Sequence, residues 1–223
     1  KKLAKQMKQN FGNEFLDTFP VNQFVLSNEC FKEVCVDYKN QKLIFSHQVT
    51  SLSKTLDQKK LNQVRVNDIL EINFESRKFI DKISSFIKEN NGGAIFFDYG
   101  YTSSHGDTFQ AIRENKFVSP LGDPGNADLT AHVDFNDIAK QAINNLVNVW
   151  GPNTQRTFLK KMGAIERFKA LESVSDNKIK QELRLGLNRL IDIDEMGKLF
   201  KVLAITSNKF PSPEGFTCGT RSS

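Results

Sequence analysis

The chain has 223 residues, of which 39% are hydrophobic and 26% charged, and it contains 19 Phe. This composition supports a folded core and excludes a disordered chain. All apolar runs fall short of the ~20 residues that a membrane-spanning helix needs, so we expect no integral membrane segment. The net charge of +5 comes from basic residues scattered among acidic ones. We therefore expect a solvated surface and no nucleic-acid partner.

The first part of the chain is predicted to combine a short helix with strands. Residues 1–10 carry apolar side chains at helical spacing. Residues 21–49 alternate in polarity, and the apolar segments 31–36 and 43–46 flank polar residues as in a hairpin. Residues 50–67 are polar and weakly patterned, which indicates a surface excursion.

The three cysteines, Cys30, Cys35 and Cys218, do not form a recognisable site. Their spacing matches neither a zinc site nor an even disulfide framework. We therefore expect reduced thiols, as in a cytosol-like compartment.

A helix followed by a buried strand gives the first indication of function. Residues 79–87 are apolar at helical spacing, and a glycine pair stops the helix. Residues 94–97 then form a continuous apolar run, typical of a strand buried in a parallel sheet. The run ends at Asp98 and Tyr99, where such sheets bind ligands. A strand-end Asp that caps a turn is at least as common, so both interpretations stay open.

The segment 99–134 is rich in Gly, Ser, Asp and Pro, with a hairpin suggested near residues 107–117. So long an irregular stretch is usually functional or disordered. His132 lies near Asp128 and Asp134, which suggests a base, a ligand or a hydrogen-bonded structural group. The other histidines share no ligand spacing with His132, so no metal site is expected.

The C-terminal part alternates helices and strands, which makes the chain an α/β protein with no internal repeat. Asp134 is placed as the N-cap of a helix. We expect strands at residues 147–150 and 199–205, and helices at 135–143, 154–162 and 178–190.

Residues 13–20 form an acidic cluster in which Glu14 and Asp17 lie three positions apart. Both carboxylates could face a cleft after a strand. Helix capping by Asn13 and the acidic first turn explains the same residues. The spacing alone does not decide between the two.

Taken together and in order, these segments resemble one family, the MidA-type methyltransferases. That family includes the mitochondrial complex I assembly factor that methylates a protein arginine. The similarity is carried by N-E-F-L-D-T-F-P at residues 13–20, G-A-I-F-F-D-Y-G at 93–100 and D-L-T-A-H-V-D-F at 128–135. Further matching segments lie at residues 106–111, 124–127, 151–155 and 196–203.

The resemblance implies the C-terminal part of a Rossmann-like class I methyltransferase sheet, with helices on both faces. It implies one domain over residues 1–223, with residues 99–134 as a loop-rich, substrate-side insertion. The glycine-rich turn and acidic residue that the family places after its first two strands have no counterpart here, so the N-terminal half is expected to be missing.

The resemblance also implies S-adenosylmethionine as the cofactor and a protein arginine as the methyl acceptor, as in a respiratory complex I subunit. The expected location is the bacterial cytoplasm or the mitochondrial matrix, and a homodimer is compatible with the family. The implied roles are cofactor contact for Asn13, Glu14 and Phe15, guanidinium binding for Glu14 and Asp17, and substrate binding for Asp98, Tyr99, Asp107, Asp128 and His132.

Two other functions stay open. One is a catalytically silent protein-binding or assembly module on a methyltransferase fold. The other is a hydrolase built on Asp128 and His132, which the lack of a Gly-x-Ser-x-Gly elbow disfavours. The polar lead-in 8–12 is unlike a buried strand, so we also expect residues to be missing between Asn10 and Asn13.

Overall fold

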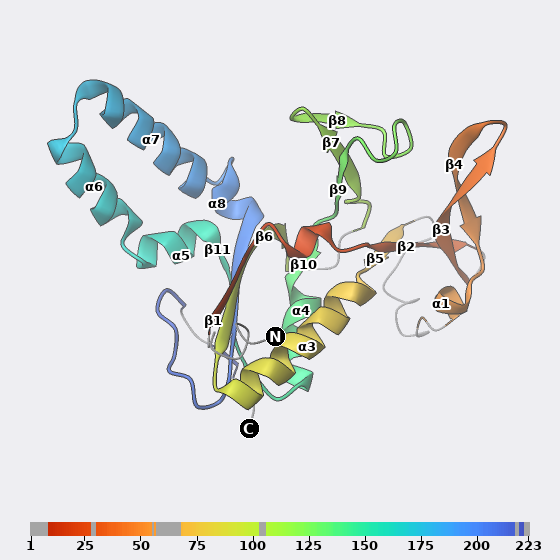
Figure 1. Ribbon diagram of the computed structural model, residues 1–223, viewed down its shortest axis with the longest axis horizontal. Helices are drawn as coiled ribbons and strands as arrows, with labels where there is room; N and C mark the ends of the chain where they lie inside the picture. Colours follow the sequence, from red (N-terminus) through yellow and green to blue (C-terminus); the bar gives the residue numbers. More distant parts are fainter. Residues whose placement is uncertain are drawn as a thin grey trace. The chain divides into compact units, whose positions relative to one another are not determined.

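The structure of the protein is a computed structural model that describes residues 9–27, 30–54, 56, 68–102, 106–216 and 219–220. Most of the helix predicted for residues 1–10, as well as His105 and Cys218, lies outside the described residues. The chain divides into two compact units (Figure 1). The first unit comprises Lys1–Asp17, Ser76–Thr102 and Val133–Ser223, and the second comprises Thr18–Glu75 and Ser103–His132. The single domain expected over residues 1–223 stays a prediction.

The first unit is built on a six-stranded sheet in which β1-β6-β12-β11-β13 are neighbours and β10 also pairs with β6. β1 and β10 run parallel to β6, whereas β12 runs antiparallel to it. The predicted parallel pairing is therefore confirmed on one side of β6 only. The strands are β1 Gln9–Asn13, β6 Gly93–Tyr101, β10 Val133–Asp134, β11 Asn148–Thr154, β12 Phe200–Thr206 and β13 Gly219–Thr220.

β1 contradicts the expectation that residues 8–12 are too polar for a strand. It pairs with β6 in unbroken register, from Gln9 opposite Gly93 to Asn13 opposite Phe97, which leaves no place for missing residues. Within the described part of the chain β1 is an edge strand, and edge strands tolerate polar residues. Gly12 allows close packing, because a Cβ there would lie 2.9 Å from the ring of Phe96.

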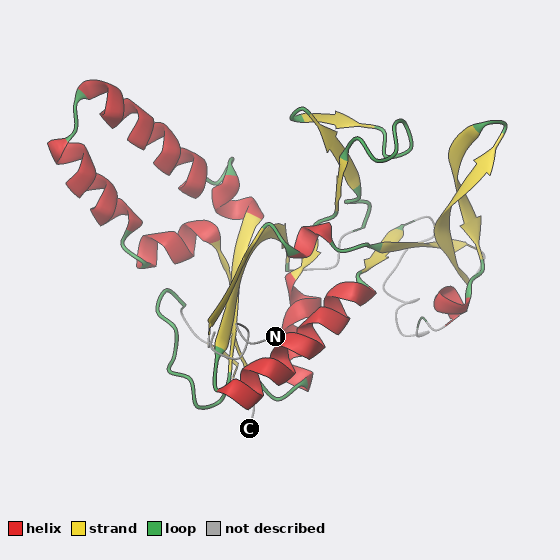
Figure 2. Ribbon diagram, in the orientation of Figure 1, coloured by secondary structure: helices red, strands yellow, loops and turns green. Residues whose placement is uncertain are grey.

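α3 Phe74–Asn90 and α4 Phe135–Asn144 lie on the same side of this sheet (Figure 2), whereas α5 Gln155–Lys161 contacts the other face, where the Phe158 and Phe97 ring centroids are 5.4 Å apart. α3 buries Ile80 and Ile87, as the apolar spacing predicted. α4 packs against β11 and β12. The Asp134 side chain accepts the N–H groups of Asn136 and Asp137, which confirms the predicted N-cap.

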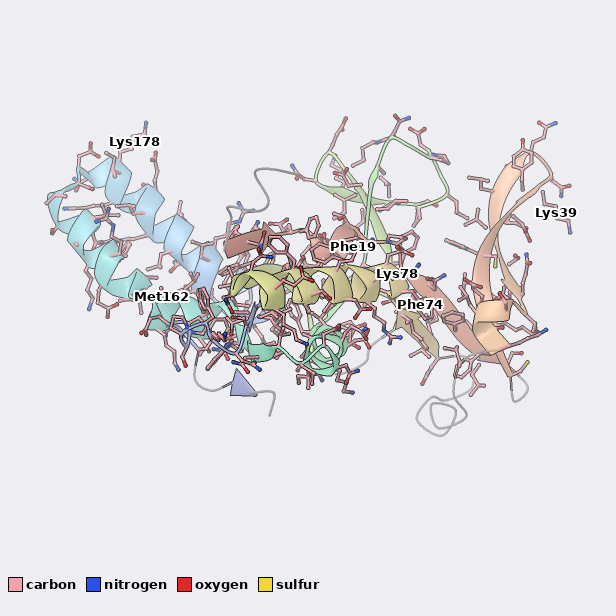
Figure 3. All side chains as sticks on the ribbon, turned by 60° about the horizontal axis from the view of Figure 1, so that its bottom comes forward. Phe19, Lys39, Phe74, Lys78, Met162 and Lys178 are labelled. Atoms are coloured by element: carbon pink, nitrogen blue, oxygen red, sulfur yellow. The ribbon has the colours of Figure 1, made fainter. Side chains whose placement is uncertain are left out.

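The other helices are α6 Ala164–Val174, α7 Asn177–Ile191 and α8 Met196–Leu199. α6 was not predicted, and neither α6 nor α7 contains a buried residue. The apolar residues of α7 are partly in solvent, with Ile179 44% and Leu190 42% exposed. Figure 3 shows the side chains around this helical pair, with Lys178 labelled in the first turn of α7.

The second unit contains two small antiparallel sheets. One has the order β4-β3-β2-β5 around a core of Phe24, Leu26, Phe31 and Ile72. The predicted hairpin is confirmed, but its turn is confined to Asn40 and Gln41. Its strands are β2 Asn22–Ser27, β3 Cys30–Lys39, β4 Lys42–Gln48 and β5 Ile69–Ile72. The short helix α1 Ser51–Lys54 lies between β4 and β5 in the chain.

The other small sheet, in the order β8-β7-β9, occupies the segment predicted to be loop-rich. β7 Gln110–Arg113 and β8 Lys116–Val118 form the hairpin suggested by the sequence, and β9 Asp128–Thr130 pairs with β7. No helix among the described residues has the length and apolar character needed to cross a membrane.

Candidate functional site

The candidate site lies where β1 ends and the chain turns into the short 3₁₀ helix η1 Leu16–Thr18. Glu14 makes the turn in the left-handed region, with φ of 45°, a conformation that is uncommon for a residue other than Gly. The Glu14 N–H donates to the carbonyl of Phe97 at 2.9 Å, which extends the pairing of β1 with β6. The turn is thus held on β6.

Asp98 holds the next three residues of this corner. Its Oδ2 accepts the N–H groups of Phe15 at 3.0 Å, Leu16 at 2.8 Å and Asp17 at 3.3 Å. These donors have no partner inside so short a helix, so a carboxylate acceptor satisfies them. The other oxygen, Oδ1, accepts the N–H of Tyr99 at 3.0 Å. Asp98 therefore caps a turn that lies 82 residues earlier in the sequence.

Burial gives Asp98 unusual acid–base properties. The residue is 1% exposed. Burial first, and then the nearby charge of Asp17, raise its pKa to about 7, although the three N–H donors act in the opposite direction. Asp98 was expected to line the substrate side, but in the structure its carboxylate is enclosed and bonded to the backbone.

Asp17 and Tyr99 form a second polar contact in the corner. The Tyr99 hydroxyl donates to Oδ2 of Asp17. Asp17 is 5% exposed, and its Oδ1 has no hydrogen-bond partner among the described residues. The Tyr99 ring packs beside Phe200, with a centroid distance of 5.5 Å. The Asp17 carboxylate is therefore linked to β6 by the hydroxyl of Tyr99.

A cavity of about 340 Å³ opens beside the corner in the first unit. Its walls include Asn13, Glu14 and Phe15, which the sequence predicted to act together. Of the predicted carboxylate pair, Glu14 lines the cavity and is exposed, whereas Asp17 lies outside the lining and is buried. The structure thus does not bring Glu14 and Asp17 into one cleft. The remaining lining residues are Asn10, Phe11, Gly12, Phe79, Ile83 and Phe96.

Aromatic rings dominate the walls of this cavity. The Phe15 and Phe79 rings meet edge-on with centroids 5.2 Å apart, and Phe79 and Phe96 are 6.1 Å apart. Among the described residues, Asn10 Nδ2 is buried without a hydrogen-bond partner. A ligand with a flat apolar ring and hydrogen-bonding groups matches these walls.

Sequence reasoning missed Phe79 and Ile83 as cavity residues, because their helical spacing looks like an ordinary core stripe. Of this stripe the structure buries Ile80 and Ile87, and spacing alone does not tell them from the cavity residues. Asn10 was missed because it stands in a polar segment that was not predicted to be a strand.

The other predicted site residues lie in the second unit. Asp107 has a left-handed φ of 60°, and Asp128 is exposed at the start of β9. The His132 N–H donates to Oγ1 of Thr108 at 2.9 Å, and that hydroxyl donates to Oε2 of Glu71 at 2.6 Å. The backbone of His132 thus helps hold the segment after residue 105 in place.

Glu71 is the centre of that polar group, although the sequence gave no indication of it. The residue is 9% exposed. Its Oε1 accepts the N–H groups of Thr108 at 2.8 Å and Phe109 at 3.1 Å, as well as the Gln23 amide at 2.9 Å. Glu71 therefore ties β5 to residues 106–109.

Comparison with protein families supports the sequence resemblance. Residues 3–153 match a family model described as "Putative S-adenosyl-L-methionine-dependent methyltransferase". The chain is also similar to the mitochondrial protein arginine methyltransferase NDUFAF7 of Danio rerio, with 33% identity over 199 residues. The match covers 87% of this chain and 46% of that protein. The chain thus spans about half the length of the curated relatives it matches.

Two solved structures from Burkholderia thailandensis share the fold. One is an uncharacterized protein with a TM-score of 0.85 and 23% identity, and the match covers 96% of this chain and 59% of that one. The other, from the same superfamily, was solved bound to S-adenosyl-homocysteine, with a TM-score of 0.83 and 23% identity. This match covers 96% of the present chain and 57% of the solved one.

Proposed function

Because the chain belongs to the family of S-adenosyl-L-methionine-dependent methyltransferases that its residues 3–153 match, we propose that the protein methylates an arginine side chain of a protein substrate. The observation that carries the proposal is that Asn13, Glu14 and Phe15 line one cavity at the end of β1. The name of the Danio rerio relative supports arginine as the acceptor.

The cavity residues fit part of S-adenosylmethionine. The rings of Phe15 and Phe79 offer apolar contact to the adenine, and the unpartnered Nδ2 of Asn10 offers a hydrogen-bond donor. Gly12 lets the backbone of β1 lie close to the ring of Phe96, where a Cβ would be 2.9 Å away. The Glu14 carboxylate can accept hydroxyl or ammonium hydrogen bonds. The bound cofactor supplies a methyl group activated by a positively charged sulfur.

The chain's own residues act on the substrate by binding and orientation. Glu14, exposed on the cavity wall, accepts two N–H groups of the guanidinium side by side and takes up the proton that the reacting nitrogen loses. This fixes a planar group whose delocalised charge otherwise makes it a poor nucleophile. The aromatic walls exclude water, and positioning of this kind supplies most of the rate enhancement.

Asp17 acts through Tyr99 in this proposal. By accepting the hydroxyl hydrogen, Asp17 holds the phenol of Tyr99 in a fixed orientation. Asp107, Asp128 and His132 are proposed to serve recognition of the substrate protein, and their segment is the insertion of residues 99–134. A respiratory complex I subunit as substrate, the mitochondrial matrix as location and a homodimer stay predictions.

Methyl transfer from labelled S-adenosylmethionine into protein tests the proposal. The wild type is expected to label arginine, and Glu14→Gln to lose at least about 100-fold in rate, because the amide cannot accept the proton. Glu166→Gln on α6 is the matched control, since this exposed residue lies outside the cavity. Equal rates for Glu14→Gln and the control would contradict the role of Glu14. Absence of labelling by the wild type, together with absence of cofactor binding, would favour the silent module.

A further inference from the structure

Asp98 is a buried carboxylate that takes no direct part in the proposed chemistry. It lies within β6, which continues to Tyr101 rather than ending at Asp98 as the sequence predicted, and it is 1% exposed, so neither cofactor nor substrate can touch it without rearrangement. All of its described hydrogen bonds come from backbone N–H groups, three from residues 15–17 and one from Tyr99. Burying a carboxylate costs free energy, so its use as an acceptor for backbone N–H groups requires an explanation.

The corner that Asp98 holds is the part of the chain that carries the cavity wall. Asn13, Glu14 and Phe15 line the cavity, and the residues directly after Glu14 donate to Asp98 Oδ2. Glu14 keeps a left-handed backbone with φ of 45°, which persists only when neighbouring contacts enforce it. The bond from the Glu14 N–H to Phe97 fixes one side of the turn, and Asp98 fixes the other.

We propose that Asp98 is a positioning residue for the cofactor, which holds residues 13–15 in the conformation that binds it. This inference rests on the proposed function, because it assumes that the cofactor occupies the cavity beside Glu14. The ionised carboxylate is the stronger acceptor of the three N–H groups, and protonation weakens all of these bonds at once. The corner is therefore ordered best when Asp98 carries its charge.

The charges around Asp98 put this equilibrium near neutral pH. Burial first, and then the charge of Asp17 on η1, raise the pKa of Asp98 to about 7. Glu14 stands at the turn, and Tyr99 next to Asp98 donates its hydroxyl to Asp17. Lys201 is opposite Asp98 on β12, but its ammonium donates to the carbonyls of Gly100, Lys198 and Leu199. No described cation thus bonds to Asp98 and holds it ionised.

Cofactor affinity should therefore depend on pH, and protonation of Asp98 should cause this dependence. As the pH falls through about 7, Asp98 takes up a proton and the corner loosens. Affinity for the cofactor should therefore fall about tenfold from about pH 8 to about pH 5.5 in the wild type. Asp98→Asn cannot titrate, so its affinity should be lower at pH 8 and should not vary with pH.

Isothermal titration of the protein with S-adenosyl-homocysteine at several pH values tests the inference. A merely structural role would lower affinity without removing the pH dependence. If Asp98→Asn binds with the wild-type affinity, or keeps the wild-type pH profile, the inference is overturned. Asp194→Asn, an exposed change in the turn before α8, is the control that should keep both affinity and profile.

A measurement without cofactor separates this inference from the proposed function. Amide hydrogen exchange of Phe15, Leu16 and Asp17, corrected for intrinsic rates, reports the corner directly. In the wild type we expect protection to drop about tenfold as the pH falls through 7, and this requires no variant to fold. Unchanged protection would overturn the positioning role even if the cofactor binds. If protection at residues 15–17 depends on pH as expected but the protein does not bind S-adenosyl-homocysteine, only the proposed function is contradicted.

Discussion

Asp98 and Leu16 are 82 residues apart in the sequence, yet Oδ2 of Asp98 accepts the N–H of Leu16 at 2.8 Å. This bond joins β6 to the corner that follows β1, and the same corner lines the cavity proposed to bind the cofactor. The protonation state of the buried Asp98 is thereby coupled to the conformation of the cavity wall.

Asp98 should make the protein less stable at alkaline pH. Its folded-state pKa of about 7 lies above the ordinary value of 3.8, so the unfolded chain releases this proton first. The contribution of Asp98 to stability is therefore full below about pH 4 and is lost as the pH rises through about 7, on the order of a few kcal/mol.

Thermal unfolding of the wild type and Asp98→Asn between about pH 5 and pH 8.5 checks this. The midpoint of the wild type should fall relative to that of the variant as the pH rises. A constant difference between the two would contradict the shifted pKa. The pH that favours the ordered corner is thus the pH at which the fold is less stable.

Gly12 should resist even the smallest side chain. A Cβ there would lie 2.9 Å from Cδ1 of Phe96, a ring that forms part of the cavity wall. Gly12→Ala should therefore cost about 1–3 kcal/mol in the free energy of unfolding and weaken cofactor binding.

Gly186 is the matched control for this change. It lies inside α7, where a Cβ would meet nothing within 4 Å. Gly186→Ala should raise the free energy of unfolding by about 0.5–1 kcal/mol, because Ala favours a helix. Denaturant titration of both variants measures the difference. The same effect at the two positions would argue against close packing at Gly12.

Much of the local structure follows from the sequence, whereas the site depends on contacts that no local pattern reveals. α3, β6 and α4 were predicted because apolar spacing, glycine stops and the Asp134 cap act within a few residues. β1 was missed because its polar residues form a strand only through pairing with β6. α6 was missed because its apolar face contacts α7 and α5 rather than a core.

The same limit applies to the site. Asn13, Glu14 and Phe15 could be grouped because they are adjacent in the sequence. That Asp98 reaches residues 15–17, and that Phe79 and Ile83 line the cavity, depends on how α3 and β6 pack beside β1. Periodicity identifies an apolar face but does not tell a core from a cavity wall.

Glu71 should be required for order in the second unit. It accepts the N–H groups of Thr108 and Phe109, the Thr108 hydroxyl and the Gln23 amide while 9% exposed. Glu71→Ala leaves these buried donors without an acceptor, which should cost about 1–3 kcal/mol. Hydrogen exchange at residues 106–109 should rise in this variant.

Glu182→Gln on α7 offers a control for Glu71, since Glu182 is exposed in the first unit. It should leave exchange at residues 106–109 unchanged. If Glu71→Ala also left that exchange unchanged, Glu71 would not be the residue that holds the segment.

A methyl donor is proposed to bind beside the corner formed by Asn13, Glu14 and Phe15. Hydrogen exchange of the protein with and without saturating S-adenosyl-homocysteine tests it most directly. We expect new protection at residues 11–15 and 79–83, and none at Ala204, Thr206 and Phe210 around the smaller cavity of about 180 Å³. Protection confined to that smaller cavity, or no protection at saturation, would contradict it.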